Sequence, residues 1–216
     1  MKFPNAYSGV KKIWLAEILM LLAAVLGIIM VIVVAGNTQV VDGEVVAVAE
    51  SVGTPAAILT IGTALLALVA FILNLVGIIS ARKDDDAFKI ALFVTLVGII
   101  ASVIASIWST NAVLTKWTDV VNTLCNLFAS YFVLTGIASL ANRYPDPETR
   151  DFALKSRTWL EGSFCLTAVL KFINNIFNIQ NETIVIIMGV AALLVEIISY
   201  VLYLRALSKG KDMLAR

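Results

Sequence analysis

Six apolar segments, each long enough to cross a lipid bilayer as a helix, follow one another along the 216-residue chain. A bilayer core about 30 Å thick needs roughly 20 helical residues to cross it. The segments are 13–35, 55–80, 88–109, 118–141, 158–178 and 183–204. The sequence therefore predicts an all-α integral membrane protein, a bundle of six transmembrane helices forming one membrane domain over residues 1–216.

The composition agrees with this class of protein. Hydrophobic residues make up 60% of the chain and charged residues 14%, and the mean hydropathy is +0.95, well above the apolar share of a soluble domain. The first segment follows a basic start, as a signal peptide does. Its apolar run is longer than the roughly 7 to 15 residues of a signal peptide, so we expect a retained helix.

Lysine and arginine fall into four groups that six spans would place on one side of the membrane. The groups are Lys2, Lys11 and Lys12; Arg82, Lys83 and Lys89; Arg143, Arg150, Lys155 and Arg157; and Arg205, Lys209, Lys211 and Arg216. Of the 16 basic residues, only Lys116 and Lys171 lie elsewhere. Because basic loops stay in the cytoplasm, this pattern predicts a multi-pass protein of the cell membrane with both termini cytoplasmic.

Three connections carry local signals. In "TQVVDGEVVAV", the Asp42-Gly43 pair lies between valine-rich runs, which favours a β-hairpin, although a short helix starting at Asp42 also fits. The stretch "DPETRDFALKSR" predicts a helix along the membrane surface, with Asp151 and Lys155 spaced to pair. The run "RKDDDAFK" is expected to form a solvated turn without a metal site.

Polar residues inside the predicted spans recur at helical spacing, so they share a face of their helix. In the fifth span these are Lys171, Asn174, Asn175 and Asn178, with Thr167 extending the face inward. In the fourth span they are Asp119, Asn122, Thr123, Asn126 and Ser130. The third span has a milder stripe beginning at Ser102 and Ser106. Polar groups are costly in lipid, so these faces should turn inward.

Two interpretations fit inward-facing polar residues. Asparagine and serine can link helices by hydrogen bonds worth roughly 0.6 kcal/mol each. Alternatively, they can line a water-filled vestibule open to the outside, with Lys171 as the charged anchor for a solute. The candidate ligand-binding residues are Lys171, Asn174, Asn175, Asn178, Asn122, Asn126, Ser130 and Glu196. Glu196 joins them because a carboxylate deep in the sixth span needs a partner or a role.

Several classes of function are disfavoured by what the chain lacks. It has no histidine, the commonest general base and metal ligand, and its two cysteines alone cannot build a zinc site. We therefore expect no metal and no cofactor. Scattered, compensating charges argue against a nucleic-acid partner. An intramembrane enzyme using Glu17, Glu161 or Glu196 is the least favoured class. Cys125 and Cys165 should be free, buried thiols.

The leading hypothesis is a membrane protein that binds or transports a small polar or anionic solute. With no phosphate-binding loop, such a chain would suit a small carrier or the substrate-binding subunit of a larger transporter. In the second case, energy must come from a membrane protein partner or energising subunit. The rival hypothesis is a non-catalytic scaffold or accessory subunit in the bilayer. Burial separates the two, because a scaffold should satisfy its asparagines mutually and a binder should leave several facing a pocket.

Overall fold

The computed structural model describes residues 2–36, 38–41, 44–47, 50–107, 112–177 and 182–216. Within these ranges, the side chains are described except for residues 34–36, 38–41, 44–47, 50–55, 112–117, 119, 168, 170–177, 182–186 and 188.

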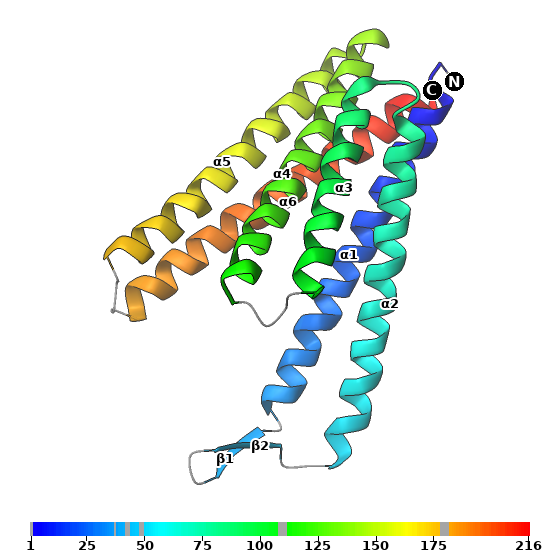
Figure 1. The fold of residues 1–216 in the computed structure, drawn as a ribbon. Helices are drawn as coiled ribbons and strands as arrows, with labels where there is room; N and C mark the ends of the chain where they lie inside the picture. Colours follow the sequence, from blue (N-terminus) through cyan, green and yellow to red (C-terminus); the bar gives the residue numbers. More distant parts are fainter. Residues whose placement is uncertain (1, 37, 42–43, 48–49, 108–111, 178–181) are drawn as a thin grey trace. The chain divides into compact units, whose positions relative to one another are not determined.

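Six long helices and one two-stranded hairpin make up this part of the chain (Figure 1). In order they are α1 (Pro4–Gly36), β1 (Thr38–Val41), β2 (Glu44–Ala47), α2 (Glu50–Ala81), α3 (Asp86–Ile107), α4 (Ala112–Arg143), α5 (Pro147–Phe177) and α6 (Glu182–Ala215). Each predicted span lies on one of these helices, apart from 108–109 and 178 at the ends of the third and fifth spans, which lie outside the described residues. Most of the helices extend well past the predicted span ends.

Within the described residues, five helices are long and apolar enough to cross a membrane, namely α1, α2, α3, α4 and α6. The chain is thus a multi-pass membrane protein of α-helical type. The predicted fifth span, 158–178, lies on α5, and most of its outer third falls outside the described side chains. The six-span topology and the cytoplasmic termini therefore remain predictions.

The helices form two compact units, which we describe separately. One unit, residues 12–76, holds most of α1 and α2 and the hairpin between them. The strands pair antiparallel from Thr38 opposite Ala47 to Val41 opposite Glu44, which confirms the predicted hairpin; the alternative of a helix starting at Asp42 is wrong. Inside this unit Asn74 donates a hydrogen bond to Glu17 over 3.5 Å.

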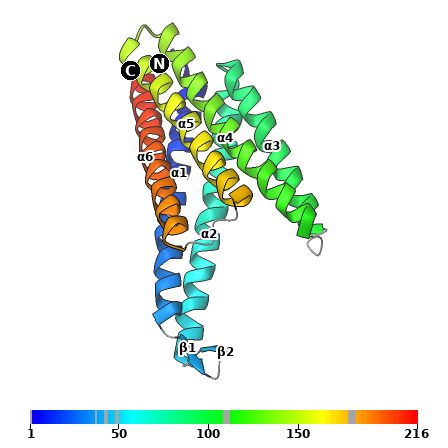
Figure 2. The same ribbon diagram turned by 90° about the vertical axis from the view of Figure 1, so that its left-hand side faces the viewer.

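The second unit, residues 1–11 and 77–216, contains the start of α1, the end of α2 and helices α3 to α6. Here α3 packs on α4, α4 on α5 and α5 on α6 (Figure 2). The N- and C-termini lie at the end where α4 joins α5 (Figures 1 and 2). We call this the basic end, because the four basic groups of the sequence gather there.

The basic end holds the core of this unit. Its fully buried side chains come from five helices and include Val10, Ile78, Phe88, Leu134, Ile137, Leu140, Leu207 and Leu214. Two glycines permit close packing there. A Cβ on Gly9 would lie 2.5 Å from the carbonyl oxygen of Gly77, and one on Gly136 would lie 2.5 Å from the Phe88 ring.

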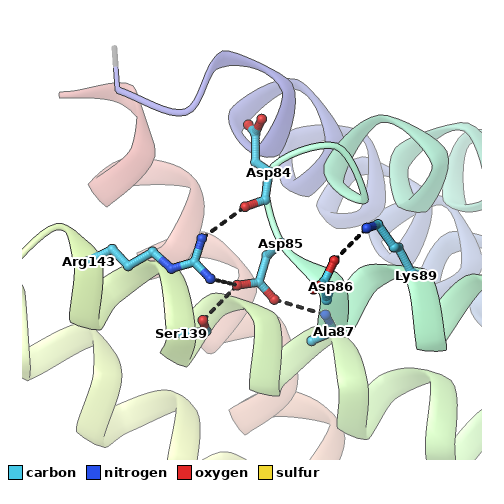
Figure 3. Close-up of polar contacts among 7 residues, drawn as sticks. All are labelled: Asp84, Asp85, Asp86, Ala87, Lys89, Ser139 and Arg143. Carbon is cyan, nitrogen blue, oxygen red and sulfur yellow. Dashed lines mark hydrogen bonds and ion pairs between the residues drawn. The ribbon is translucent and has the colours of Figure 1, made fainter.

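Aspartates of the α2–α3 turn tie the basic end together (Figure 3). Asp85 is 7% exposed, caps α3 by accepting the Ala87 N–H at 2.9 Å, and also accepts the Ser139 hydroxyl at 2.6 Å. Arg143, at the end of α4, pairs with Asp85 at 3.1 Å and donates to the Asp84 carbonyl oxygen at 3.2 Å. The prediction of a solvated turn is therefore wrong for these two aspartates.

The Asp84 carboxylate points away from Arg143 in Figure 3. It accepts hydrogen bonds from residues at the start of α1. It accepts the Ala6 N–H at 2.6 Å and the Asn5 side-chain amide at 3.1 Å. An aspartate 78 residues away along the chain thus supplies the acceptor that a helix N-terminus needs. Lys2 adds a hydrogen bond to the Arg143 carbonyl oxygen at 3.1 Å.

Three smaller predictions need correction. The stretch predicted as a surface helix leading into the fifth span is continuous with that span as the first part of α5, which starts at Pro147 with Asp146 accepting the Thr149 N–H as its cap. Asp151 pairs with Arg150 at 2.9 Å, its neighbour in sequence, instead of with Lys155. Cys165 is free but exposed, whereas Cys125 is free and buried as predicted.

Candidate functional site

A pocket of about 480 Å³ lies between α4, α5 and α6, within the second unit. Helix α4 contributes a stripe at helical spacing, and α5 contributes a second stripe. The lining residues are Val120, Thr123, Leu124, Asn126, Leu127 and Ser130 from α4, Leu160, Ser163, Phe164 and Thr167 from α5, and Glu196 from α6. This volume is within the range of small-molecule sites.

The pocket lies near the middle of its helices. At about 1.5 Å per residue, Asn126 is about 21 Å from the start of α4 and Glu196 about 21 Å from the start of α6. Thr167 is about 15 Å from the end of α5. All three distances are measured from the end opposite the basic end, so the pocket lies deep within the apolar length of the bundle.

The pocket wall has two kinds of surface. Val120, Leu124, Leu127, Leu160 and Phe164 supply apolar contact area. The six other lining residues are polar, and they include a carboxylate. A ligand pocket usually combines both kinds of surface, because the apolar area supplies affinity and the polar groups fix orientation.

Hydrogen bonds within the described part of the chain occupy only some of the donors and acceptors on this wall. Thr167 donates its hydroxyl to Glu196 Oε1 at 3.1 Å, and Ser163 donates to the Leu160 carbonyl oxygen at 2.9 Å. Among the described residues, Asn126 and Ser130 have no hydrogen-bond partner. Their donors and acceptors, and the second oxygen of Glu196, remain available to a bound molecule.

The predicted site residues divide between this pocket and another surface. Asn126, Ser130 and Glu196 line the pocket together. Asn122, one turn before Asn126, instead donates its side-chain amide to the Ser102 hydroxyl of α3 at 3.0 Å. One polar stripe of α4 therefore links helices at Asn122 and lines a cavity at Asn126.

Four predicted residues cannot be placed by their side chains. Lys171, Asn174 and Asn175 are helical, at the end of α5, but their side chains lie outside the described part. Asn178 follows α5 and lies outside the described residues altogether. Whether Lys171 faces the pocket stays a prediction.

The other intramembrane carboxylates are separate from the pocket lining. Glu161 pairs with Arg157 at 3.7 Å, as its position one turn away suggests. The Arg157 guanidinium also lies over the Tyr131 ring, 4.9 Å from its centre, and donates to Thr135 at 3.4 Å. Glu17 belongs to the other unit. The ion pair connects Glu161 through Arg157 to Tyr131 and Thr135 of α4.

Sequence reasoning missed Ser163 and Phe164 as lining residues. The available signal was the i, i+4 spacing of Ser163 and Thr167, which continues the polar face of α5 inward. Sequence reasoning also missed a second hollow of about 540 Å³ at the basic end, lined by the α4–α5 connection, the start of α5 and the end of α6. Its charged side chains partly neutralise one another, since Lys209 pairs with Glu148.

No protein-family model, no curated protein and no solved structure matches this chain.

Proposed function

We propose that this protein binds a small polar solute in the α4–α5–α6 pocket and carries it across the membrane. The observation that supports the proposal is the set of unsatisfied polar groups on the pocket wall. Asn126 and Ser130 have no partner in the described part of the chain, and Glu196 has only the Thr167 hydroxyl. A protein that used these residues only to link helices would pair them with one another.

The depth of the pocket strengthens this argument. Thr123, Asn126 and Glu196 are exposed in the isolated chain, within helices that have the length and apolarity of membrane spans. Facing lipid, an unsatisfied amide or carboxylate would cost several kcal/mol. Facing a water-filled vestibule, the same groups stay hydrated and can exchange water for a solute.

The proposal extends to the orientation of the protein and its partners. With the basic end in the cytoplasm, the pocket would open toward the outside, and the protein would lie in the cell membrane. Energy for transport would come from an ion gradient or from a partner subunit. If the solute is anionic, Lys171 would be the residue that anchors it.

A second candidate function has one observation in its favour. Asn122 and Ser102 form a hydrogen bond between α4 and α3, as in a scaffold whose polar residues only link helices. A non-catalytic accessory subunit would extend this use to Asn126, Ser130 and Glu196 by pairing them with a partner protein.

Thermal unfolding of the purified protein in detergent, against a library of cationic, neutral and anionic metabolites, tests the proposal. A ligand at 100 times its Kd should stabilise the protein by about 2.7 kcal/mol. We expect Asn126→Ala to abolish this stabilisation and Asn122→Ala, one turn away on the same helix, to retain it.

The result against the proposal is equally specific. If no compound stabilises the wild-type protein, and Asn126→Ala is itself less stable than Asn122→Ala, then the residues of the pocket wall hold the protein or its complex together. The scaffold would then be the better description.

A further inference from the structure

The charge of the pocket wall restricts the kind of solute that fits it. Glu196 is the one ionisable group among the described lining residues. It is not ion-paired in the described part of the chain, and a single hydroxyl donates to one of its two oxygens. A carboxylate at this depth is unfavourable unless a cation or several donors reach it.

Two basic residues with described side chains on the lining helices are used elsewhere or lie far from Glu196; Lys171, one turn beyond Thr167 on α5, lies outside the described side chains. Arg157 stacks on Tyr131 and pairs with Glu161. Arg205, on the same helix as Glu196, is exposed and about 13 Å farther along the helix axis. Neither of them supplies the missing positive charge.

The rest of the wall fits a cation with an apolar body. Phe164 can accept an ammonium group against its ring, as aromatic side chains do for organic cations. The Asn126 amide oxygen and the Ser130 hydroxyl can accept N–H hydrogen bonds. Leu124, Leu127 and Leu160 supply apolar area for a hydrocarbon body.

We infer that the solute is an organic cation of the ammonium type, held by the Glu196 carboxylate with its apolar part against Phe164 and the leucines. This inference rests on the proposed function and narrows its substrate class. It competes directly with an anionic solute held by Lys171.

Three probes of similar shape and different charge separate these possibilities: 2-phenylethylammonium, phenylacetamide and phenylacetate. Equilibrium dialysis of each labelled probe against the full-length protein in lipid nanodiscs gives its Kd. We expect the ammonium probe to bind at least about tenfold more tightly than the amide, the ratio that about 1.4 kcal/mol of charge interaction gives.

The variants assign this preference to one carboxylate. Glu196→Gln should bring the ammonium and amide affinities to within about twofold, whereas Glu161→Gln, a carboxylate outside the pocket lining, should retain the tenfold ratio. If Glu196→Gln does not fold, Glu196→Asp keeps the charge and should keep the preference for the ammonium probe.

Equal binding of the ammonium and amide probes would overturn the inference. Tighter binding of phenylacetate, lost in Lys171→Ala, would overturn it in favour of an anionic solute while leaving the proposed function intact. If no phenyl probe binds, the metabolite library tests the inference. Stabilisation by neutral or anionic compounds would overturn the inference of a cationic solute. Stabilisation by cationic compounds that is lost in Glu196→Gln would support it. Failure of the whole library overturns the proposed function itself.

Discussion

Helix α4 passes through two regions in which the same kinds of residue differ in burial and in hydrogen bonding. Toward the basic end, Val133, Leu134, Ile137, Leu140 and Ala141 are almost completely buried. In the half that precedes them, Val120 is 50% exposed and Phe128 is 47% exposed. Polar side chains follow the same division, because Ser139 is hydrogen-bonded at the basic end and Asn126 has no partner in the described part of the chain.

This difference separates the contribution of polar residues to stability from their contribution to function. At the basic end, a buried carboxylate with three donors fixes the positions of two helix ends and a turn. In the pocket, the carboxylate has one donor and space beside it. Substitutions at the basic end should therefore change stability, and substitutions in the pocket should change binding.

The two largest expected effects are at the basic end and are of similar size; the first is overpacking. Gly136→Ala would place a Cβ 2.5 Å from the fully buried Phe88 ring, which has no room to move, so we expect a loss of about 1–3 kcal/mol. The control is Gly162→Ala on α5, where a Cβ meets nothing within 4 Å. It should stabilise its helix by about 0.5–1 kcal/mol.

SDS-induced unfolding in mixed micelles measures both free energies of unfolding. If Gly136→Ala and Gly162→Ala shift the unfolding midpoint equally, the basic end is not close-packed in the way described above.

The next effect concerns adjacent aspartates. Asp85→Asn removes the charge that Ser139, Arg143 and the Ala87 N–H share, so we expect a loss of about 1–3 kcal/mol in the same unfolding assay. Asp86→Asn is the control, because Asp86 is 87% exposed and contacts Lys89 at the surface. We expect no measurable change for it. Equal losses for the two variants would contradict a buried role for Asp85.

The smallest effect separates two asparagines one turn apart. Asn122→Ala loses the bond to Ser102, so its free energy of unfolding should fall by about 0.6 kcal/mol. Asn126→Ala loses no bond within the described part of the chain and should change stability by less than about 0.5 kcal/mol. The reverse order would show that Asn126 has a structural partner.

Length and apolarity were enough to predict the helices from the sequence, because lipid leaves the backbone few alternatives. The Asp42-Gly43 signal favoured the hairpin, whose strands pair on either side of it, but did not exclude a short helix. Helix ends were predicted less well, since α4, α5 and α6 continue as helices beyond the apolar length that was counted. Hydropathy marks the bilayer and does not mark the end of a helix.

The periodicity of α4 showed that Asn122 and Asn126 share a stripe, yet they contact different neighbours. Their assignment depends on which helix packs on each edge of that stripe, which a single sequence does not contain. The role of Asp85 was missed for a similar reason. Its partners Ser139 and Arg143 are more than 50 residues away along the chain, and only the packing of α3 on α4 brings them together.

Water access to the pocket tests the central claim most directly. Asn126→Cys, Asn122→Cys and Ala138→Cys, each made with Cys125 and Cys165 replaced by serine, can be exposed to a membrane-impermeant cationic methanethiosulfonate in sealed proteoliposomes. This reagent modifies thiols that water reaches. The expected result is fast modification at position 126 and little at 122, which faces α3, or at 138, which is 6% exposed at the basic end. A thiol at position 126 that stays as unreactive as one at 138 would contradict a water-filled pocket and with it the binding function proposed for this protein.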